Sequence, residues 1–223
     1  MRLNKFLALG MGVSRREADD LISAGRVLID GLIATLGSRV EDKSTVLVDG
    51  ELVTTQPFVY LAFNKPVGYV SSRAAQGDAP TLYELLPKEY YQLKTVGRLD
   101  KDSSGLLILT NDGDFAFKMT HPQFSKVKIY EVVLDHKLEP LHQQMIADFG
   151  VNLDDGRSQL GLTALDDGRK KWRVEMSEGR NRQIRRTFGS LGYTVVDLHR
   201  TQFGKYSLGG LKSGKFETVK NLV

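Results

Sequence analysis

The chain has 223 residues, of which 41% are hydrophobic and 26% charged, so it can bury one large core or a small core and a medium one. It contains no cysteine, which excludes disulfides, zinc–thiolate sites and cysteine nucleophiles and favours a reducing compartment. The early apolar run lacks a cleavage site, and no later run approaches the ~20 residues of a membrane span. We therefore expect a cytoplasmic protein with no membrane partner.

The net charge of +4 is only mildly basic and by itself says little about partners. Its distribution says more, because one stretch carries eight basic residues against two acidic ones, Glu175 and Glu178. The basic residues are Arg169, Lys170, Lys171, Arg173, Arg180, Arg182, Arg185 and Arg186. Such a concentrated positive field favours a polyanionic partner.

The first 55 residues predict a small α+β domain. Helical spacing of apolar residues in "RLNKFLA" indicates one helix, and Ser14 with Glu17 forms a capping box that starts a second. The segments "GRVLIDGLIAT" and "STVLVDGELV" each read as two strands joined by an Asp-Gly turn. The polar segment "TTQPF" is the linker that we expect after this domain.

Residues 59–223 predict a second, α+β domain. We expect strands in "VYLAFNKPVGYVSS", "GLLILT", "VKIYEVVL", "KWRVEMS" and "YTVVDLHRTQFGKYSL". We expect a short helix in "TLYELLPKEYY" that ends near Pro87, and helices over "GDFAFKMTH", "KLEPLHQQMIADFG" and "RNRQIRRTFGSLG". Their irregular order favours a mixed sheet flanked by helices over a doubly wound fold.

The stretch "GRLDKDSSGLLILTNDG" holds an aspartate, Asp100, just before a run of aliphatic residues. Its first half resembles a calcium loop, but Ile108 and Asn111 stand at later ligand positions, which excludes calcium. Two interpretations stay open. Asp100 is either a turn residue or a carboxylate held at a cleft by a rigid strand, which would need a cationic partner to stay ionised.

The segment "EGRNRQIRRTF" is either a solvated basic helix or part of a site. Ile184 and Phe188 are spaced to face a core, so one face is expected to be buried, with Arg185 beside it. Tyr130 is either a core residue or a platform for an unpaired base. The four histidines show no metal-ligand spacing and no phosphate-binding glycine loop is present, so we expect no metal and no cofactor.

Several motifs in order resemble the RsuA-type pseudouridine synthases, which act on bacterial ribosomal RNA. "RLNKFLA", "SRREADDLI" and "GRVLIDG" resemble their S-four RNA-binding domain, and "NKPVGYV", "GRLDKDSSGLLILTNDG", "KIYEV" and "EGRNRQIRRTF" resemble their catalytic domain. The resemblance implies an S-four-like domain over residues 1–55 and a catalytic domain with a largely antiparallel sheet over 59–223. It also implies isomerisation of uridine to pseudouridine without a cofactor.

The same resemblance assigns roles to single residues. Asp100 matches the catalytic aspartate, Tyr130 the tyrosine that packs on the target uracil, Arg185 the arginine that pairs with the aspartate, and Ile184 an apolar wall. Asp100 could attack the anomeric carbon, add to the uracil ring or remove a ribose proton. Ile129 stands where many relatives have threonine and is not expected to change these assignments.

Basic residues in both domains are the candidate RNA contacts: Lys5, Arg15, Arg16, Arg26, Lys65, Arg98, Arg180, Arg182 and Arg186. The implied partner of this expected monomer is ribosomal RNA or a ribosome assembly intermediate, and "RNRQIRRTFGSLGY" favours the large subunit. Two other classes of protein fit the sequence less well. A binding-only protein would not need both Asp100 and Arg185, and a glycoside hydrolase would need a second carboxylate farther away than Asp102.

Overall fold

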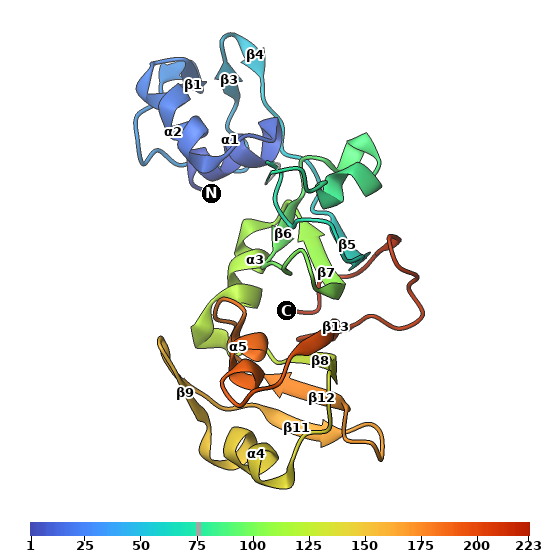
Figure 1. Ribbon diagram of the computed structural model, residues 1–223. Helices are drawn as coiled ribbons and strands as arrows, with labels where there is room; N and C mark the ends of the chain where they lie inside the picture. The colour runs from blue at the N-terminus through green and yellow to red at the C-terminus, as the bar shows by residue number, and fades with distance from the viewer. Residues whose placement is uncertain (75–76) are drawn as a thin grey trace. The chain divides into compact units, whose positions relative to one another are not determined.

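The computed structural model describes residues 1–74 and 77–223 and separates into two compact units, Met1–Phe58 and Val59–Val223 (Figure 1). Each unit has its own hydrophobic core. In the part of the chain that is described, no helix is both long and apolar enough to cross a membrane.

The first unit packs two helices, α1 (Leu3–Met11) and α2 (Arg15–Ser23), against a sheet with the strand order β2-β1-β3-β4. The predicted capping box of α2 is confirmed, because the Ser14 hydroxyl accepts from the Glu17 amide at 3.1 Å and the Glu17 carboxylate accepts from the Ser14 amide at 2.6 Å. The strands are β1 (Val27–Ile29), β2 (Leu32–Ile33), β3 (Val46–Val48) and β4 (Glu51–Leu52).

Both predicted Asp-Gly turns join antiparallel neighbours in this unit. Asp30 and Gly31 have φ values of 51° and 82°, and Asp49 and Gly50 have 52° and 85°. Two successive residues with positive φ are the signature of the type I′ hairpin, whose twist matches that of the flanking strands. The turn sequence therefore fixes which residues of these short strands face the helices.

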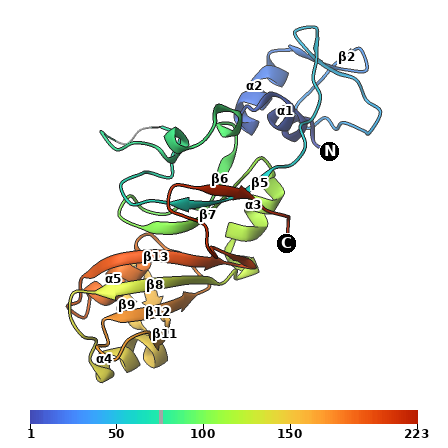
Figure 2. The same ribbon diagram turned by 90° about the vertical axis from the view of Figure 1, so that its right-hand side faces the viewer.

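The second unit is built on a mixed sheet with the order β11-β12-β8-β13-β7-β5-β15, onto which β14 and β6 are added (Figure 2). Among the described strands β7 and β13 pair in parallel and the other neighbours are antiparallel, as predicted. The strands are β5 (Tyr60–Lys65), β6 (Lys94–Val96), β7 (Ser104–Thr110), β8 (Lys128–Leu134), β11 (Gly161–Ala164), β12 (Lys171–Met176), β13 (Val195–Phe203), β14 (Tyr206–Ser207) and β15 (Phe216–Thr218).

Both faces of this sheet carry a hydrophobic core, and β7 contributes to both because its alternate residues point to opposite sides. Leu107 and Leu109 belong to a core that includes Phe188 of α5 (Gln183–Gly189). Leu106 and Ile108 belong to another core that includes Phe115 of α3 (Gly113–Thr120). The expected run of buried aliphatics is confirmed, and it anchors the loop that precedes it.

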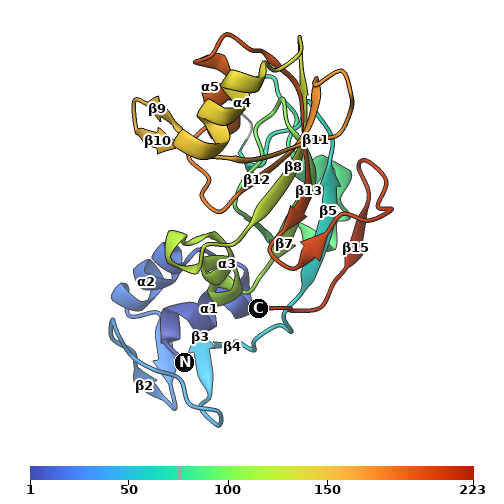
Figure 3. The same ribbon diagram turned by 90° about the horizontal axis from the view of Figure 1, so that it is seen from below.

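Several elements differ from the sequence-based prediction. The short helix expected to end near Pro87 does end there, at Leu85, but it is a 3₁₀ turn, Leu82–Leu85, and a second 3₁₀ turn, Lys88–Tyr90, follows the proline. The helix α4 (Pro140–Gln144) continues as a π-helical turn, Met145–Phe149, and α5 ends at Gly189 rather than near residue 192. The strands β6, β11 and β15 and the hairpin of β9 (Val151–Leu153) and β10 (Gly156–Ser158) were not predicted. Figure 3 shows that hairpin beside α4 and α5.

The neighbour of β7 changes where the Asp100 loop enters the strand. Residues Ile108, Leu109 and Thr110 pair with β6, whereas Ser104 and Gly105 pair with β13. Gly105 is required at this point, because it has φ +105° and an added Cβ would lie 2.3 Å from the backbone oxygen of Arg200. The two strands approach too closely for any side chain there.

Candidate active site

A cavity of about 490 Å³ lies in the second unit, within the size range of small-ligand sites. Asp100 follows the buried residue Leu99 and contributes to the wall, and the 176–184 segment forms much of the opposite side. Residues from β8 and β13 complete the lining. The residues on which the site is built are Arg98, Asp100, Lys128, Tyr130, Glu178, Arg180, Arg182, Ile184, Leu198 and Arg200.

The cation beside Asp100 is Arg182, not Arg185. Its guanidinium lies 3.6 Å from the Asp100 carboxylate and binds both carboxylate oxygens of Asp102, at 3.0 and 2.9 Å. Arg182 was predicted to contact RNA, which stays a prediction, and its place between the two carboxylates adds a role that the sequence did not suggest. One guanidinium therefore offsets part of the negative charge of two neighbouring carboxylates.

The backbone of Arg182 explains how this side chain reaches the carboxylates. Arg182 is the N-cap residue of α5 and has φ +47°, in the left-handed region that non-glycine residues seldom occupy. Such strain persists only where surrounding contacts impose it, and it gathers at functional sites. The pair of hydrogen bonds to Asp102 is one such contact.

Arg185 instead supports the loop that carries Asp100. Its side chain is 13% exposed and lies outside the cavity lining, with Nη1 donating to the carbonyl of Val195 at 2.6 Å and Nη2 donating to the carbonyl of Asp102 at 2.8 Å. Its Nε lies 3.3 Å from the Asp102 carboxylate. The predicted pairing of Arg185 with Asp100 is therefore wrong in this structure, since α5 directs this side chain toward Asp102.

The electrostatics of Asp102 follow from these contacts. The hydrogen bond from Arg182, together with the charges of Arg185 and Arg182, holds the pKa of Asp102 below its usual value against the opposing effect of burial. Sequence reasoning dismissed Asp102 as a second carboxylate too close on the turn. The signal that could have found its role is the spacing of Arg182 and Arg185, which places two guanidinium groups at one end of one helix.

Tyr130 and Ile184 form apolar walls of the cavity, as expected for a pocket that holds a flat ring. Tyr130 is 7% and Ile184 4% exposed, and both line the cavity together with Leu198. Tyr130 pairs in register with Arg200 of β13, whose guanidinium carbon lies 6.0 Å from the centre of the Tyr130 ring. Sequence reasoning missed Arg200, because a single arginine on a strand carries no motif.

A hydrogen-bond network holds the wall opposite Asp100. The Gln183 amide donates to Glu178 at 2.7 Å and to the hydroxyl of Ser158 at 3.1 Å, and it accepts from the backbone amide of Arg180 at 3.1 Å. The Arg180 side chain binds Asp155 at 2.7 Å. These contacts tie the 178–183 loop to the unpredicted β9–β10 hairpin.

Two predicted RNA contacts in this unit, Lys65 and Arg186, lie outside the cavity lining. Lys65 is fully buried and donates to the carbonyls of Pro66 and Tyr69 at 2.9 and 2.8 Å, so the prediction that it contacts RNA is wrong. Burial lowers the pKa of Lys65 to about 8, against the opposing charges of Asp100 and Asp102. Arg186 lies outside the cavity lining and binds Asp155 at 2.7 Å.

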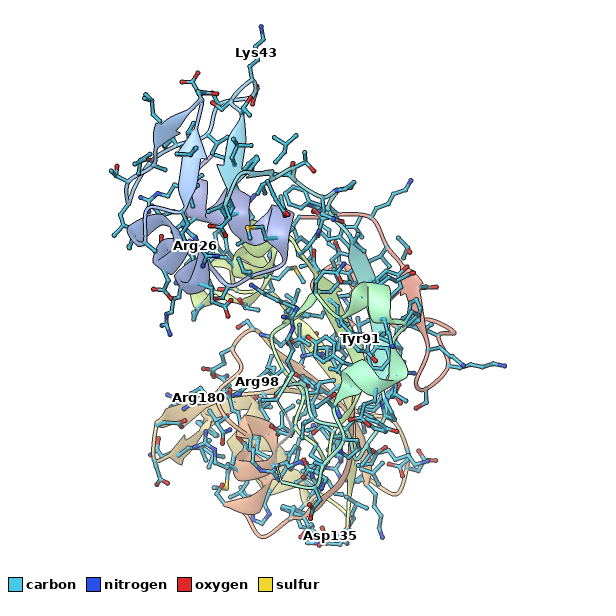
Figure 4. All side chains as sticks on the ribbon, turned by 90° about the horizontal axis from the view of Figure 1, so that it is seen from above. Arg26, Lys43, Tyr91, Arg98, Asp135 and Arg180 are labelled. Carbon is cyan, nitrogen blue, oxygen red and sulfur yellow. The ribbon has the colours of Figure 1, made fainter. Side chains whose placement is uncertain are left out.

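Arg98 and Arg180 are the remaining basic candidates of this unit, and both are labelled in Figure 4. Arg98 is exposed and lines the cavity. Arg180 also lines it, although its guanidinium is engaged by Asp155 and Glu178. Their contact with RNA stays a prediction.

The four candidates of the first unit lie on or next to its helices. Lys5 is on α1, and Arg15 and Arg16 are exposed in the first turn of α2. Arg26 follows α2 and forms two hydrogen bonds with the Asp49 carboxylate, so its charge is already partly compensated. In the residues that the structure describes, no cluster of three or more His, Asp or Glu side chains could hold a metal ion.

Comparison with known proteins gives this arrangement a family. Residues 59–190 match the RNA pseudouridylate synthase family, and residues 1–46 match the S4 domain. The chain is 35% identical to ribosomal large subunit pseudouridine synthase B of Bacillus subtilis, over 96% of the chain and 89% of that protein. It is 36% identical to ribosomal small subunit pseudouridine synthase A of Yersinia pestis, over 93% and 89% respectively.

The fold agrees with a solved structure. A crystal structure of a pseudouridylate synthase superimposes with a TM-score of 0.70 at 32% identity, covering 99% of this chain and 96% of that one. The α+β fold, with its mixed and largely antiparallel sheet, is therefore confirmed together with the family resemblance. The chain belongs to the RNA pseudouridylate synthases, isomerases that act on RNA, and carries an S4 domain at its N-terminus.

Proposed function

We propose that the protein converts a specific uridine of ribosomal RNA to pseudouridine, with Asp100 as the catalytic carboxylate. One observation carries this proposal: Asp100 lines the cavity whose apolar walls are Tyr130 and Ile184, and Arg182 lies 3.6 Å from its carboxylate. The reaction breaks the bond from ribose C1′ to uracil N1 and forms a bond from C1′ to C5. C5 loses its proton and N1 gains one, so no external reagent is required.

The cavity suits a base that has left its helical stack. An uracil buried in RNA structure cannot be turned in place, so the target must be single-stranded or flipped outward, at a cost of a few kcal/mol. The Tyr130 ring offers a packing surface, and Ile184 and Leu198 exclude water around the freed base. Basic residues at the rim, such as Arg98, would offset the cost through phosphate contacts.

The glycoside hydrolase alternative has less support than the isomerase. Both oxygens of Asp102 accept hydrogen bonds from Arg182, and the pKa of Asp102 is held low, whereas such a hydrolase needs a protonated acid as its second carboxyl. Measuring pseudouridine formation distinguishes the isomerase from a protein that only binds RNA.

We propose that the substrate is ribosomal RNA, free or in an assembly particle, and that the enzyme is a monomer. We propose the large subunit as the target because of the sequence "RNRQIRRTFGSLGY".

The test replaces the carboxylate without changing its size. Asp100→Asn should abolish pseudouridine formation in ribosomal RNA and leave RNA affinity within about twofold, since an amide of the same size replaces one partly exposed carboxylate. Asp197→Asn, which changes an exposed aspartate of β13 outside the cavity, is the matched control and should retain full activity. Pseudouridine formed by Asp100→Asn at a rate near that of the wild type would overturn the assignment.

The target is found by mapping. Comparing pseudouridines across the ribosomal RNA of cells with and without this gene should show one modified position that disappears with the gene. A position in the small subunit would contradict the proposed large-subunit target, and an unchanged map would contradict ribosomal RNA as the substrate.

A further inference from the structure

Two cations on the strands that line the cavity, Lys128 on β8 and Arg200 on β13, have no salt bridge among the described residues. Arg200 is 2% exposed, donates through Nε to the carbonyl of Leu106 at 2.7 Å, and has a buried Nη2 without a hydrogen-bond partner. Lys128 donates to the carbonyls of Glu178 and Lys126 at 3.0 and 3.5 Å. Carbonyl oxygens satisfy hydrogen bonds but leave the positive charges uncompensated.

These two charges lie close together at one ring. The Arg200 guanidinium carbon is 5.0 Å and the Lys128 nitrogen 5.5 Å from the centre of the Phe203 ring. Burial, and secondly the charge of Arg200, lower the pKa of Lys128 to about 8, while Glu178 opposes this effect. The Glu178 carboxylate is itself engaged by Gln183 at 2.7 Å and Arg180 at 3.3 Å.

The other strongly held arginines of the cavity differ, because each has a carboxylate. Arg182 has Asp100 and Asp102, and Arg180 has Asp155. Removing a charge from water without a partner is costly, and the cost is recovered when an anion binds beside it. Lys128 and Arg200 differ from these arginines, because no carboxylate in the described part of the chain balances their positive charges.

We propose that Lys128 and Arg200 form a phosphate-binding subsite, which takes a phosphate attached to the ribose of the target uridine. The accessible Lys128 nitrogen donates to the phosphate, and the deeper Arg200 adds a second charge beneath it. This inference rests on the proposed function, because it assumes a uridine in the cavity.

The register of the sheet supports this choice of anion. Lys128 and Tyr130 are separated by one residue on β8 and face the same side, about 7 Å apart. Tyr130 is also directly opposite Arg200. A base packed on Tyr130 thus carries its ribose toward the two cations, and phosphates are the anions that RNA presents.

The experiment compares uridine with uridine 5′- and 3′-monophosphate, titrated into the full-length protein and followed by NMR. Wild type should bind at least one monophosphate about tenfold more tightly than uridine, the effect of a charge-assisted hydrogen bond. Lys128→Met should lose this preference and keep its uridine affinity. Lys118→Met, an exposed lysine of α3 outside the cavity, is the matched control and should retain the preference.

Several results would overturn the subsite. The subsite is contradicted if wild type binds uridine and both monophosphates equally, or binds none of them. It is also contradicted if Lys128→Met weakens the affinity for uridine and for the monophosphates alike, because the cations would then contact the base. Arg200→Lys keeps the buried charge and should retain part of the preference. Tryptophan fluorescence of Trp172, in the core of this unit, checks that each variant is folded.

The subsite and the proposed function fail in different ways. A monophosphate preference in a protein that forms no pseudouridine would contradict the function and leave the subsite intact. Pseudouridine formation without any monophosphate preference would contradict the subsite and leave the function intact.

Discussion

Gly105→Ala tests whether the close approach of β7 and β13 holds the site together. The added Cβ would lie 2.3, 2.6 and 2.9 Å from the backbone O, N and C of Arg200, so β13 would have to move. Alanine would also be strained at φ +105°. Backbone strain costs about 1–3 kcal/mol and overpacking about 1–3 kcal/mol, which together predict a loss of about 4 kcal/mol in the free energy of unfolding.

The assay uses the single tryptophan of the chain. Trp172 is fully buried in the second unit, so its fluorescence during urea or thermal unfolding reports on that unit. A loss of about 4 kcal/mol should lower the melting temperature by about 10 °C in a domain of this size. Pseudouridine formation should fall as well, at temperatures where the variant is still folded, because β13 carries Arg200 and Leu198 into the cavity.

Gly113→Ala is the matched control for this experiment. Gly113 begins α3, and nothing lies within 4 Å of the Cβ that alanine would add there. Alanine is favoured over glycine in a helix by up to about 1 kcal/mol, so this variant should be as stable as wild type or more stable. A Gly105→Ala protein that unfolds within about 1 kcal/mol of Gly113→Ala would refute the reasoning.

Three further predictions concern charge and domain organisation. Arg182→Gln should lower the rate of pseudouridine formation about tenfold, because two partly exposed carboxylates lose their common cation. The control Arg186→Gln should change this rate less than twofold. Equal effects of the two variants in single-turnover kinetics would contradict the role of Arg182. The pKa of Lys65 is about 8 in the folded protein and 10.5 in the unfolded chain. Between pH 8 and pH 10.5 Lys65 is protonated in the unfolded chain but not in the folded protein. The free energy of unfolding of wild type should therefore rise with pH relative to that of Lys65→Met, by at most about 1.4 kcal/mol per pH unit. A difference between the two proteins that stays constant with pH, in unfolding followed by Trp172 fluorescence, would contradict this. Deleting residues 1–58 should weaken ribosomal RNA binding or change site choice without shifting the Trp172 unfolding transition, and unchanged affinity and modification would rule out targeting by the first unit.

The sequence predicts elements well where local chemistry decides the structure. The Ser14 capping box, the Asp-Gly hairpins and the buried 106–109 strand all depend on neighbouring residues, and all are present. In the 81–91 segment Pro87 ends the first helical turn as expected, whereas helical spacing did not reveal that this turn is a 3₁₀ helix. The β9–β10 hairpin carries weak periodicity and is held by contacts from the Arg180 and Gln183 segment.

The sequence predicts which residues form the site better than it predicts which of them contact each other. The motifs identify Asp100, Tyr130 and Ile184, which the structure brings to one cavity. They assign the contact with Asp100 to Arg185, whereas the structure gives it to Arg182. The direction of each side chain depends on the left-handed backbone at Arg182, which the spacing of residues does not reveal. Lys65 was assigned to the surface by residue type, although its strand passes through the interior.

The central strand of the catalytic sheet joins two parts of the chain that are completed before it. β13 lies between β7 and β8, yet it follows both by more than sixty residues. Until residues 195–203 are available, the strand with the Asp100 loop and the strand with Tyr130 cannot be joined into one sheet, because each pairs with β13 and not with the other. A chain truncated before Val195 should therefore lack the pocket and expose the unpaired edges of β7 and β8, which favour aggregation.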